Sequence, residues 1–443
     1  MQLRDYQARA LEGVRGHLRA GRKSVLLVAP TGAGKGTIAA EVLRTTVARG
    51  GRALFLVHRG EILADVRGRL AKAGMLDTAI LKAGERAQLG ASVQLASVQT
   101  LAARPDVRPP ASVVVWDEAH HAVAETYRQI REAYPDAVHL GLTATPQRAD
   151  RSPLGDCFEA LVVAATPRQL RDQGHLVPCE VRAAEPGEGL AMSPLEAYQR
   201  WGEGRRCIVF CASVAESQAT VKALADAGVG AAHIDGATSA PERAAALAAL
   251  AAGTVRVVCN VFVLTEGVDV PSVEVCILAR GCQAESTFLQ MVGRVLRPCE
   301  GKTGALLVDL RGVVWEHGLP YDDREYSLDG RGIRRKESGG IAAWSCADCY
   351  SVNPRKATVC GRCGAPKPKR VLEQEIEARG VSEAHGGNVV DEAFKRRVFD
   401  DLVRTCRERG FKPGFVGAQF KARFGFWPKW PMPLAIPPSE EAS

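Results

Sequence analysis

Short apolar runs alternate with amphipathic stretches along the first three quarters of the chain. The first group of runs lies at 24–29, 53–57, 92–97, 112–116 and 137–142. A second group follows at 206–211, 230–234, 255–259, 273–279 and 304–309. Continuous apolar runs of this length, separated by helix-like segments, are typical of buried parallel strands joined by helices. The pattern therefore predicts two α/β domains, each with an open, mainly parallel sheet that carries helices on both faces.

Composition between and after these two regions suggests where the domains end. Residues 182–204 are rich in Gly, Pro and Glu, which is typical of a segment that joins two lobes. Four clustered cysteines follow the last apolar run. We expect a first α/β domain at 1–180, a linker at 181–204, a second α/β domain at 205–330, a small cysteine domain at 340–368, and a basic helical tail at 369–443 with a disordered end.

Basic charge is concentrated in the last quarter of the chain. Residues 330–443 contain 21 Lys and Arg against 13 Asp and Glu, whereas residues 1–329 contain 37 of each, so the whole net charge of +8 lies in the C-terminal part. A basic appendage on a neutral core suggests a polyanionic partner. A solvated charged surface explains such runs equally well.

The chain has no apolar run near the roughly 18 residues that span a bilayer, and its first residues lack the apolar core of a signal peptide. Most of the 13 cysteines stand singly in strand-like runs, where small buried thiols are ordinary. We therefore expect a soluble, cytoplasmic protein in a reducing compartment, with no membrane partner.

A glycine-rich segment, 29–37, follows the first apolar run and precedes a helix-like stretch. A strand, a glycine loop and a helix in this order direct backbone N–H groups at one point, where nucleotide phosphates can bind. The expected phosphate-binding residues are Pro30, Thr31, Gly32, Ala33, Gly34, Lys35, Gly36 and Thr37. Lys35 would supply charge to the β- and γ-phosphates. Gly36 replaces the hydroxyl residue that normally holds Mg²⁺, so the rate of hydrolysis is in question while nucleotide binding is not.

Two acids end the apolar run 112–116 and would face the glycine loop from a neighbouring parallel strand. Asp117 is expected to hold Mg²⁺, and Glu118 to polarise the water that attacks the γ-phosphate. In the second lobe, Arg294 and Arg297 are three residues apart and share a helix face. If that lobe closes over the nucleotide, these arginines can reach the γ-phosphate in trans.

With these residues in place, the chain resembles a superfamily 2 helicase of the DEAD/DEAH-box type, and most of all the DEAH-like DNA translocase branch. The likeness covers residues 3 to about 310 and implies two tandem RecA-like domains. It is carried, in order, by the segments 3–7, 55–59, 97–101, 117–120, 142–146, 209–213, 264–269 and 290–297.

The resemblance implies roles for further residues. Contacts with the nucleotide are implied for Gln7, which would read the adenine, and for Gly267, Asp269 and the motif residue Gln290. Contacts with the nucleic-acid backbone are implied for Arg59, Thr100 and Thr265. Coupling between hydrolysis and movement of the lobes is implied for His120, Thr143 and Thr145.

The predicted activity is ATP-dependent movement along nucleic acid or strand separation, largely independent of sequence, with DNA favoured over RNA. An RNA helicase is an alternative within the same class. A nucleic-acid-binding clamp that binds ATP but hydrolyses it slowly, because of Gly36, is an alternative from another class.

Two C-x-x-C pairs lie ten residues apart, and their cysteines are Cys346, Cys349, Cys360 and Cys363. Four thiolates at this spacing can close a tetrahedral, structural Zn²⁺ site. With Trp344 and Asn353, the segment resembles the Ran-binding-protein type of zinc finger, which implies a module that recognises single-stranded RNA or a protein. A purely structural zinc ribbon is the alternative.

The tail combines an amphipathic helical pattern at 393–409 with aromatic residues interleaved with basic ones from 412 to 430. Such interleaving suits base stacking together with phosphate contact. It also suits a small helical hairpin with its own core, which we favour. Protein partners are possible through either the cysteine domain or the tail.

Overall fold

The structure is a computed structural model of the whole chain. The residues it describes are 3–58, 60, 63–82, 84–121, 124–146, 153–183, 190–265, 270–329, 334–335, 343–354, 357–367 and scattered positions between 396 and 428. They form two compact units, Met1–Pro368 and Lys369–Ser443.

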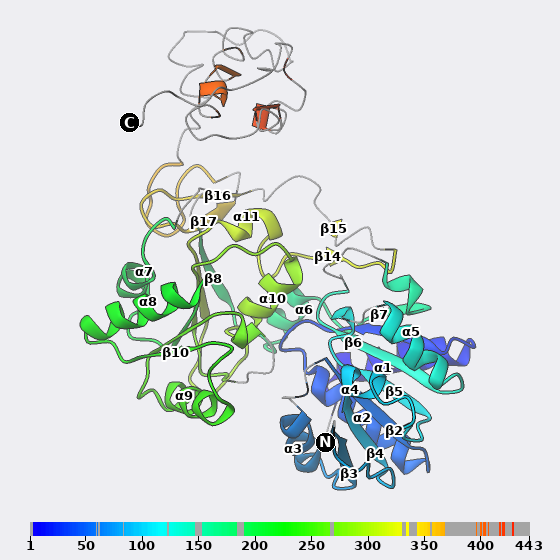
Figure 1. The fold of residues 1–443 in the computed structure, drawn as a ribbon. Coiled ribbons are helices and arrows are strands. Elements are labelled where there is room, and N and C mark those ends of the chain that lie inside the picture. Colours follow the sequence, from blue (N-terminus) through cyan, green and yellow to red (C-terminus); the bar gives the residue numbers. More distant parts are fainter. Residues whose placement is uncertain are drawn as a thin grey trace, which may run out of the picture. The chain divides into compact units, whose positions relative to one another are not determined.

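The first lobe of the larger unit is a seven-stranded parallel sheet (Figure 1). Its strands, in spatial order, are β3 (Thr78–Leu81), β4 (Val93–Ser97), β2 (Ala53–Val57), β5 (Val113–Trp116), β6 (Val138–Thr143), β1 (Ser24–Val28) and β7 (Ala160–Val163). Its helices are α1 (Asp5–Arg19), α2 (Lys35–Ala48), α3 (Leu63–Lys72), α4 (Val98–Ala102), α5 (Ala124–Ala133) and α6 (Pro167–Asp172), with short 3-10 turns at Ala119–His121 and Leu154–Asp156.

Side chains of the central strands alternate between two apolar layers, as a pleated strand requires. Val25 and Leu27 of β1 pack with α1, α2 and α3 on one face. Leu26 and Val28 pack with α4 and α5 on the other. Because both faces are covered, the central strands are apolar throughout, and this produced the runs seen in the sequence.

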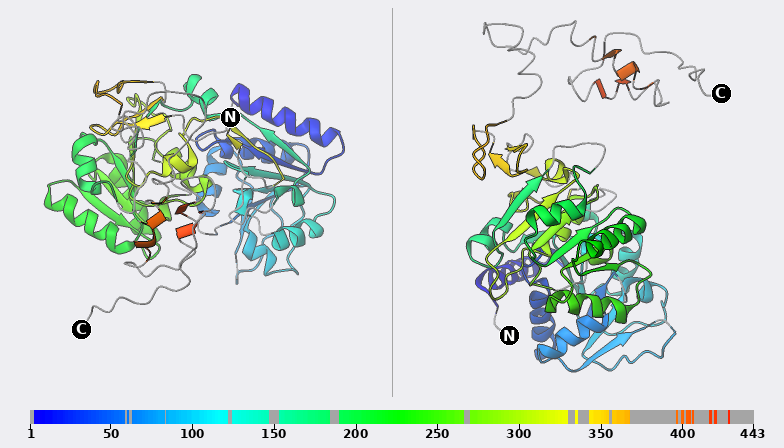
Figure 2. Two further views of the ribbon diagram at one scale, coloured as in Figure 1. Left: turned by 90° about the horizontal axis from the view of Figure 1, so that it is seen from above. Right: turned by 90° about the vertical axis from the view of Figure 1, so that its left-hand side faces the viewer.

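The second lobe is a six-stranded parallel sheet of the same kind. Its strands, in spatial order, are β10 (Ala231–Ile234), β11 (Val257–Asn260), β9 (Cys207–Phe210), β12 (Val275–Leu278), β13 (Ala305–Asp309) and β8 (Cys179–Ala183). Its helices are α7 (Pro194–Trp201), α8 (Val214–Asp226), α9 (Ala240–Ala252), α10 (Glu285–Gly293) and α11 (Val313–His317), with a 3-10 turn at Val263–Thr265. Figure 2 shows the two lobes, blue to cyan and green to yellow, as separate layered sheets. The expected fold class is confirmed.

The helix ends follow the signals in the sequence. Helix α9 begins with a capping box between Ser239 and Glu242, has Pro241 in its first turn, and ends at Gly253, whose φ is +81°. Among the described residues, no helix is long and apolar enough to cross a membrane.

The expected linker at 181–204 differs from the structure. Its first residues belong to β8, which pairs with β13, and residues 194–201 form α7. Trp201 and Tyr198 of α7 are buried in the apolar layer of the second lobe. The second lobe therefore begins at Cys179, because an edge strand and its covering helix occupy much of the glycine- and proline-rich stretch.

Residues 343–367 form the cysteine domain, hereafter the finger. Its hairpin, β16 (Ala343–Ser345) and β17 (Val352–Pro354), is antiparallel. The finger is docked on the second lobe: Ala183 N–H donates to Tyr350 O (2.9 Å), and Arg182 forms an antiparallel bridge with Ser351. A second short antiparallel pair, β14 (Arg324–Glu325) with β15 (Arg334–Arg335), precedes it.

In the C-terminal unit, described helical residues lie between Arg396 and Cys406 and between Val416 and Phe420. Phe399, Cys406, Val416 and Phe420 form a small buried cluster. The rings of Phe399 and Phe420 lie edge to face at 6.1 Å. These contacts favour the helical-hairpin interpretation of the tail. Of the aromatic residues between 412 and 430, Phe420 alone belongs to the described residues.

Candidate nucleotide site and cysteine centre

The glycine loop connects β1 to α2 at the carboxyl end of the first sheet. Gly32 and Gly34 have φ values of +90° and +77°, a left-handed conformation that a side chain would strain. Gly34 is also the N-cap of α2, and no side chain caps that helix. Its first N–H groups are therefore left for an anion, as the sequence predicted.

Helix α1 braces this loop. Gln7 is buried, and its Nε2 donates to Ala33 O (2.9 Å), while Tyr6 Oη donates to the same carbonyl (2.8 Å). A Cβ added to Gly34 would lie 2.6 Å from Gln7 Nε2. Gln7 thus contacts the phosphate loop itself, and its implied contact with the adenine stays a prediction.

The two acids follow β5, next to the glycine loop. Lys35 Nζ donates to Glu118 Oε1 at 2.8 Å, so the cation of the loop and the acid expected to act as base form a mostly buried ion pair. Burial, together with the adjacent Glu118 charge, raises the pKa of Asp117 to about 6, against the opposing effect of Lys35. Glu118 has a left-handed backbone (φ +46°), which is unusual for a residue with a side chain. The arrangement brings together the three residues that the sequence assigned to hydrolysis.

A chain of buried polar contacts leads away from this pair. His120 Nδ1 lies 3.5 Å from Glu118 Oε2 and 3.0 Å from Thr143 Oγ1. Thr143 Oγ1 donates to Thr145 O (2.7 Å) and accepts from Thr145 N–H (3.1 Å). The residues implied to couple hydrolysis to movement are therefore linked in one network from Lys35 to Thr145.

The second lobe contacts the glycine loop through the segment that contains its arginines. A Cβ on Gly293 would overlap the side chain of Thr31, and a Cβ on Gly32 would lie 3.7 Å from Arg297 Cγ. Gln290, which is expected to be catalytic together with the arginines, and Arg294 are both buried, at 4% and 8% exposure. The structure thus brings the end of α10 and the segment after it against the phosphate loop. The expectation that Arg294 and Arg297 share a helix face is wrong, because α10 ends at Gly293, Arg294 is its C-cap, and Arg297 lies beyond the helix.

Lys302 was not singled out by sequence reasoning. Its Nζ donates to Arg297 O and Pro271 O (2.9 Å each) and to Val273 O. The lysine therefore fixes the backbone that carries Arg297. A lone lysine gives no signal of this role in the sequence, because its partners are backbone carbonyls and two of them lie about 30 residues away.

Of the residues implied to contact nucleic acid, Thr100 lies at the start of α4, where Ser97 Oγ accepts its N–H (3.0 Å) and donates to its Oγ1 (2.8 Å). It borders a cavity of about 280 Å³, lined also by Gly60, Leu63, Ala64, Ile80, Leu81 and Lys82. Thr265 is the last residue of the 3-10 turn that follows β11. Arg59, Gly267 and Asp269 lie outside the described residues.

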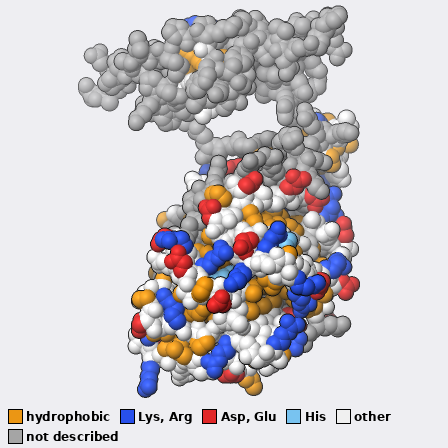
Figure 3. Space-filling view, turned by 90° about the vertical axis from the view of Figure 1, so that its right-hand side faces the viewer, with side chains coloured by type: hydrophobic (Ala, Val, Ile, Leu, Met, Phe, Trp, Pro, Cys, Tyr) orange, Lys and Arg blue, Asp and Glu red, His pale blue; other side chains and the backbone are white. Residues whose placement is uncertain are grey.

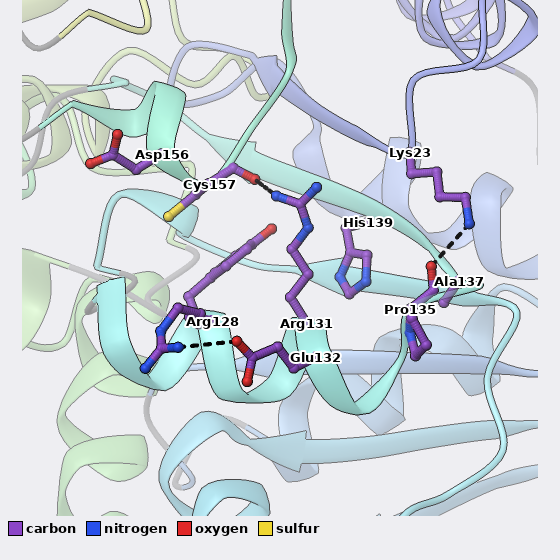
Figure 4. Close-up of a pocket in the computed structure, with 10 residues that line it drawn as sticks. Lys23, Arg128, Arg131, Glu132, Pro135, Ala137, His139, Asp156 and Cys157 are labelled. Carbon is purple, nitrogen blue, oxygen red and sulfur yellow. Dashed lines mark hydrogen bonds and ion pairs between the residues drawn. The ribbon is translucent and has the colours of Figure 1, made fainter.

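A larger cavity of about 460 Å³ lies at the amino ends of strands β1 and β6 of the first sheet (Figure 4). Lys23 lines it and precedes β1, whereas the phosphate loop follows β1, so the two sites are separated by the strand's length of roughly 16 Å. Its charged groups have protein partners: Lys23 Nζ donates to Pro135 O, and Arg128 pairs with Glu132. This cavity is not part of the nucleotide site.

The four cysteines of the finger converge as predicted. Their Sγ atoms all lie within 4.8 Å of one another, with Cys346 and Cys363 at 3.5 Å and Cys349 and Cys360 at 3.6 Å. Four thiolates around a tetrahedral Zn²⁺ at about 2.3 Å would have sulfurs roughly 3.8 Å apart, so the donor set fits this ion.

The residues that suggested a Ran-binding-protein finger brace this centre from within. Asn353 Oδ1 accepts Gly361 N–H (3.0 Å), and its Nδ2 donates to Cys360 Sγ (3.5 Å). Trp344 is buried and donates from Nε1 to Ala357 O (2.9 Å). Both side chains are therefore engaged in holding the finger together.

Comparison with known proteins gives two family matches. Residues 1–148 match the family described as "Type III restriction enzyme, res subunit", and residues 193–299 match "Helicase conserved C-terminal domain". Together they cover the glycine loop, the acids and both arginines.

Individual relatives agree with these matches. The chain is 27% identical over 384 residues to a 51.5 kDa protein of a Lactococcus phage, which covers 80% of this chain and 81% of the relative. It is 31% identical over 151 residues to the DNA 3'-5' translocase XPB2 of Sulfurisphaera tokodaii, covering 34% of this chain and 32% of that one.

Among solved structures, the DNA-bound ATP-dependent Type ISP restriction-modification enzyme LlaBIII has a similar fold. The TM-score is 0.53 at 18% identity, over 69% of this chain and 27% of that one. The paired sheets, the phosphate loop facing the end of α10 and the two matched families lead to one conclusion: the chain is a superfamily 2 helicase, an ATP-hydrolysing enzyme.

Proposed function

We propose that this protein is a DNA translocase or helicase whose ATP site is completed by the second lobe. The observation that carries the proposal is the contact of Gly293 and Arg297 with the phosphate loop. That loop contains Lys35, which forms an ion pair with Glu118 from the end of β5. A site assembled from two lobes links each round of ATP hydrolysis to their opening and closing.

The residues act on the nucleotide in distinct ways. The loop N–H groups and Lys35 bind the β- and γ-phosphates. Glu118 accepts a proton from, and orients, the attacking water, once the phosphates draw Lys35 away from it. Arg294 and Arg297 stabilise charge that develops on the γ-phosphate. Gln290 lies on α10, which ends just before Arg294, and supports the arrangement. Gly267 and Asp269 are proposed to contact the nucleotide.

Mg²⁺ fits the carboxylate side of this site. Asp117 is partly buried and offers an oxygen ligand of the kind that Mg²⁺ prefers. When bound, the ion would neutralise charge on the phosphates. Gly36 contributes no hydroxyl, and a Cβ there would meet nothing within 4 Å, so a side chain could be accommodated at this position. Thr37 offers the nearest hydroxyl in the sequence.

The DNA substrate is supported by the relatives, since one is a DNA translocase and another is a restriction enzyme bound to DNA. Arg59, Thr100 and Thr265, which follow β2, β4 and β11 in the chain, are proposed to contact the phosphodiester backbone. Hydroxyl and backbone groups at such positions hold phosphates without reading bases. Binding should therefore depend on salt more than on sequence.

The decisive experiment measures Mg²⁺-ATPase activity without polymer and with duplex DNA, single-stranded DNA or RNA. We expect stimulation by DNA, and Lys35→Ala serves as the inactive control. Hydrolysis no faster than this control under all four conditions would refute the enzyme, and stimulation by RNA alone would refute the DNA substrate. Gly36→Thr tests the loop: a large gain in the rate of ATP hydrolysis would show that the native glycine limits this rate.

We further propose that Cys346, Cys349, Cys360 and Cys363 hold one structural Zn²⁺ and that the protein works in the reducing cytoplasm, where these thiols stay available. Metal analysis of the purified full chain should give one zinc per molecule. Cys363→Ser should lose it, whereas Cys157→Ser, a buried cysteine far from the finger in sequence, should retain it. Equal zinc content in both variants would contradict the assignment.

A further inference from the structure

The second lobe carries an exposed aromatic side chain at the edge of its sheet where motifs gather. Phe262 follows β11 by two residues, and 48% of it is exposed. Among the described residues, Leu76, Val163, Val214 and Val359 are also large, apolar and exposed, but none of these is aromatic. An exposed ring at this edge offers a flat surface for a ligand.

The backbone at Phe262 is strained. Its φ is +56°, in the left-handed region that bulky residues avoid. The turn is held firmly: Asn260 is buried, donates from Nδ2 to Val209 O (3.0 Å), and accepts Leu264 N–H at its Oδ1 (3.3 Å). The ring is thus presented by a fixed loop, and such outliers collect at functional sites.

Arg280, which follows β12, lies against the same ring. Its guanidinium carbon is 3.3 Å from the centre of the Phe262 ring. Its Nε donates to Gly281 O (3.1 Å), while its Nη1 is buried without a hydrogen-bond partner among the described residues. A stacked arginine with an unused donor is suited to an acceptor-rich ligand.

The position of this pair in the topology is informative. Strands β11 and β12 flank β9, so Phe262 and Arg280 meet at the carboxyl end of β9. From β9 the chain enters α8 on one face, and from β12 it enters α10 on the other. Adjacent strands whose connections leave on opposite faces form the crevice where open α/β sheets bind ligands.

From these contacts we infer that Phe262 and Arg280 form a stacking platform for a base of single-stranded DNA. This inference rests on the proposed DNA substrate and adds a contact to bases where only backbone contacts are expected. Stacking on a ring is tolerant of sequence, since every base has a π-face. The platform would hold one base of the tracked strand while the lobes open and close.

The test uses the full chain, an ATP analogue, and two fluorescent strands of equal length: oligo-dT and the same strand with abasic sites in place of bases. Phe262→Gly removes the ring and relieves the left-handed backbone, so it should keep or raise the unfolding temperature. It should weaken binding of oligo-dT about tenfold and leave binding of the abasic strand unchanged. Phe262→Trp should restore the affinity for oligo-dT.

The matched control is Leu76→Ala, which removes a more exposed apolar side chain from the first lobe. It should bind both strands like the unaltered protein. If Phe262→Gly lowers the affinity for both strands equally, or for neither, the platform is overturned while the DNA substrate stands. Failure of the unaltered protein to bind either strand would overturn the platform, and the ATPase assay with duplex DNA would decide whether the DNA substrate fails as well.

Discussion

The two lobes share one strand order, but two of their strand–helix junctions differ. In the first lobe, β1 leads into α2 through two left-handed glycines, and no side chain caps the helix. In the second, β9 leads into α8 through Ser213, whose Oγ accepts Glu216 N–H (3.1 Å), while Glu216 Oε2 accepts Ala212 N–H (3.0 Å). One helix N-terminus is open to a phosphate, and the other is already satisfied by its own side chains.

The open junction suits the first lobe to bind the phosphates of ATP. The second lobe contributes by placing Gly293 and Arg297 against the phosphate loop of the first. The lobes therefore differ in what they offer a nucleotide although their sheets share a strand order.

The largest expected effect comes from making one chemical change in both lobes. Glu118→Gln should lower kcat about 10²–10⁴-fold, because an amide cannot accept the proton of the attacking water. Glu216→Gln should leave kcat essentially unchanged, since it alters only a helix cap. Steady-state ATPase assays measure both, and nucleotide binding by fluorescence confirms that each variant still takes up ATP. Similar losses in the two variants would show that the lobes are less different than proposed.

A smaller effect is expected from the glycines of the first junction. Gly34→Ala should destabilise the protein by about 1–3 kcal/mol, because Ala at φ +77° is strained and its Cβ meets Gln7. Gly36→Ala should be neutral or stabilising by up to about 1 kcal/mol, since this residue is helical and has open space. Thermal unfolding of the two variants should move in opposite directions, and a shift of both in the same direction would contradict the assigned roles.

The smallest expected effect concerns Lys302, which fixes the backbone of Arg297 in the second lobe. Burial lowers the pKa of Lys302 to about 8, against the raising effect of Cys299, Glu274 and Cys179, with Arg297 lowering it slightly further. Loss of its proton removes one of three donors to backbone carbonyls. We therefore expect kcat to fall a few-fold as pH rises through about 8.

Stability should change in the opposite sense over this range. The unfolded chain binds the Lys302 proton more tightly than the folded one, so folding is favoured as pH rises from about 8 towards the ordinary value of 10.5. Lys302→Arg, which stays charged, should remove the alkaline fall in kcat. An unchanged alkaline limb in this variant would assign the fall to another group.

Much of the fold follows from sequence because central strands are apolar on both faces. The runs at 24–29 and 112–116 coincide with β1 and β5, and the expected glycine loop lies between β1 and α2. Strands β3, β7 and β8 produced no such run. All three lie at sheet edges and are only partly buried, so their polar residues obscure the pattern.

In the candidate site, too, some residues can be predicted from the sequence and others cannot. Lys35, Asp117 and Glu118 belong to local motifs with known chemistry, and the structure brings them together. The contacts of Lys302 and the pairing of Phe262 with Arg280 join segments that are distant in sequence. No local pattern specifies such contacts, because they depend on which strands become neighbours.

On the face seen in Figure 3, basic side chains are interspersed with acidic ones, and residues 1–329 contain equal numbers of the two. The DNA-binding groups of that lobe should therefore be few and placed by the fold, with little help from a long-range field.

The docking of the finger on β8 also bears on the solubility of the protein. A strand at the edge of a sheet exposes N–H and C=O groups that can recruit a strand from another molecule. Residues 350 and 351 of the finger occupy this edge at Arg182 and Ala183. An intact finger thus shields the second sheet from edge-to-edge association, and a chain deprived of its zinc would be prone to aggregate through β8.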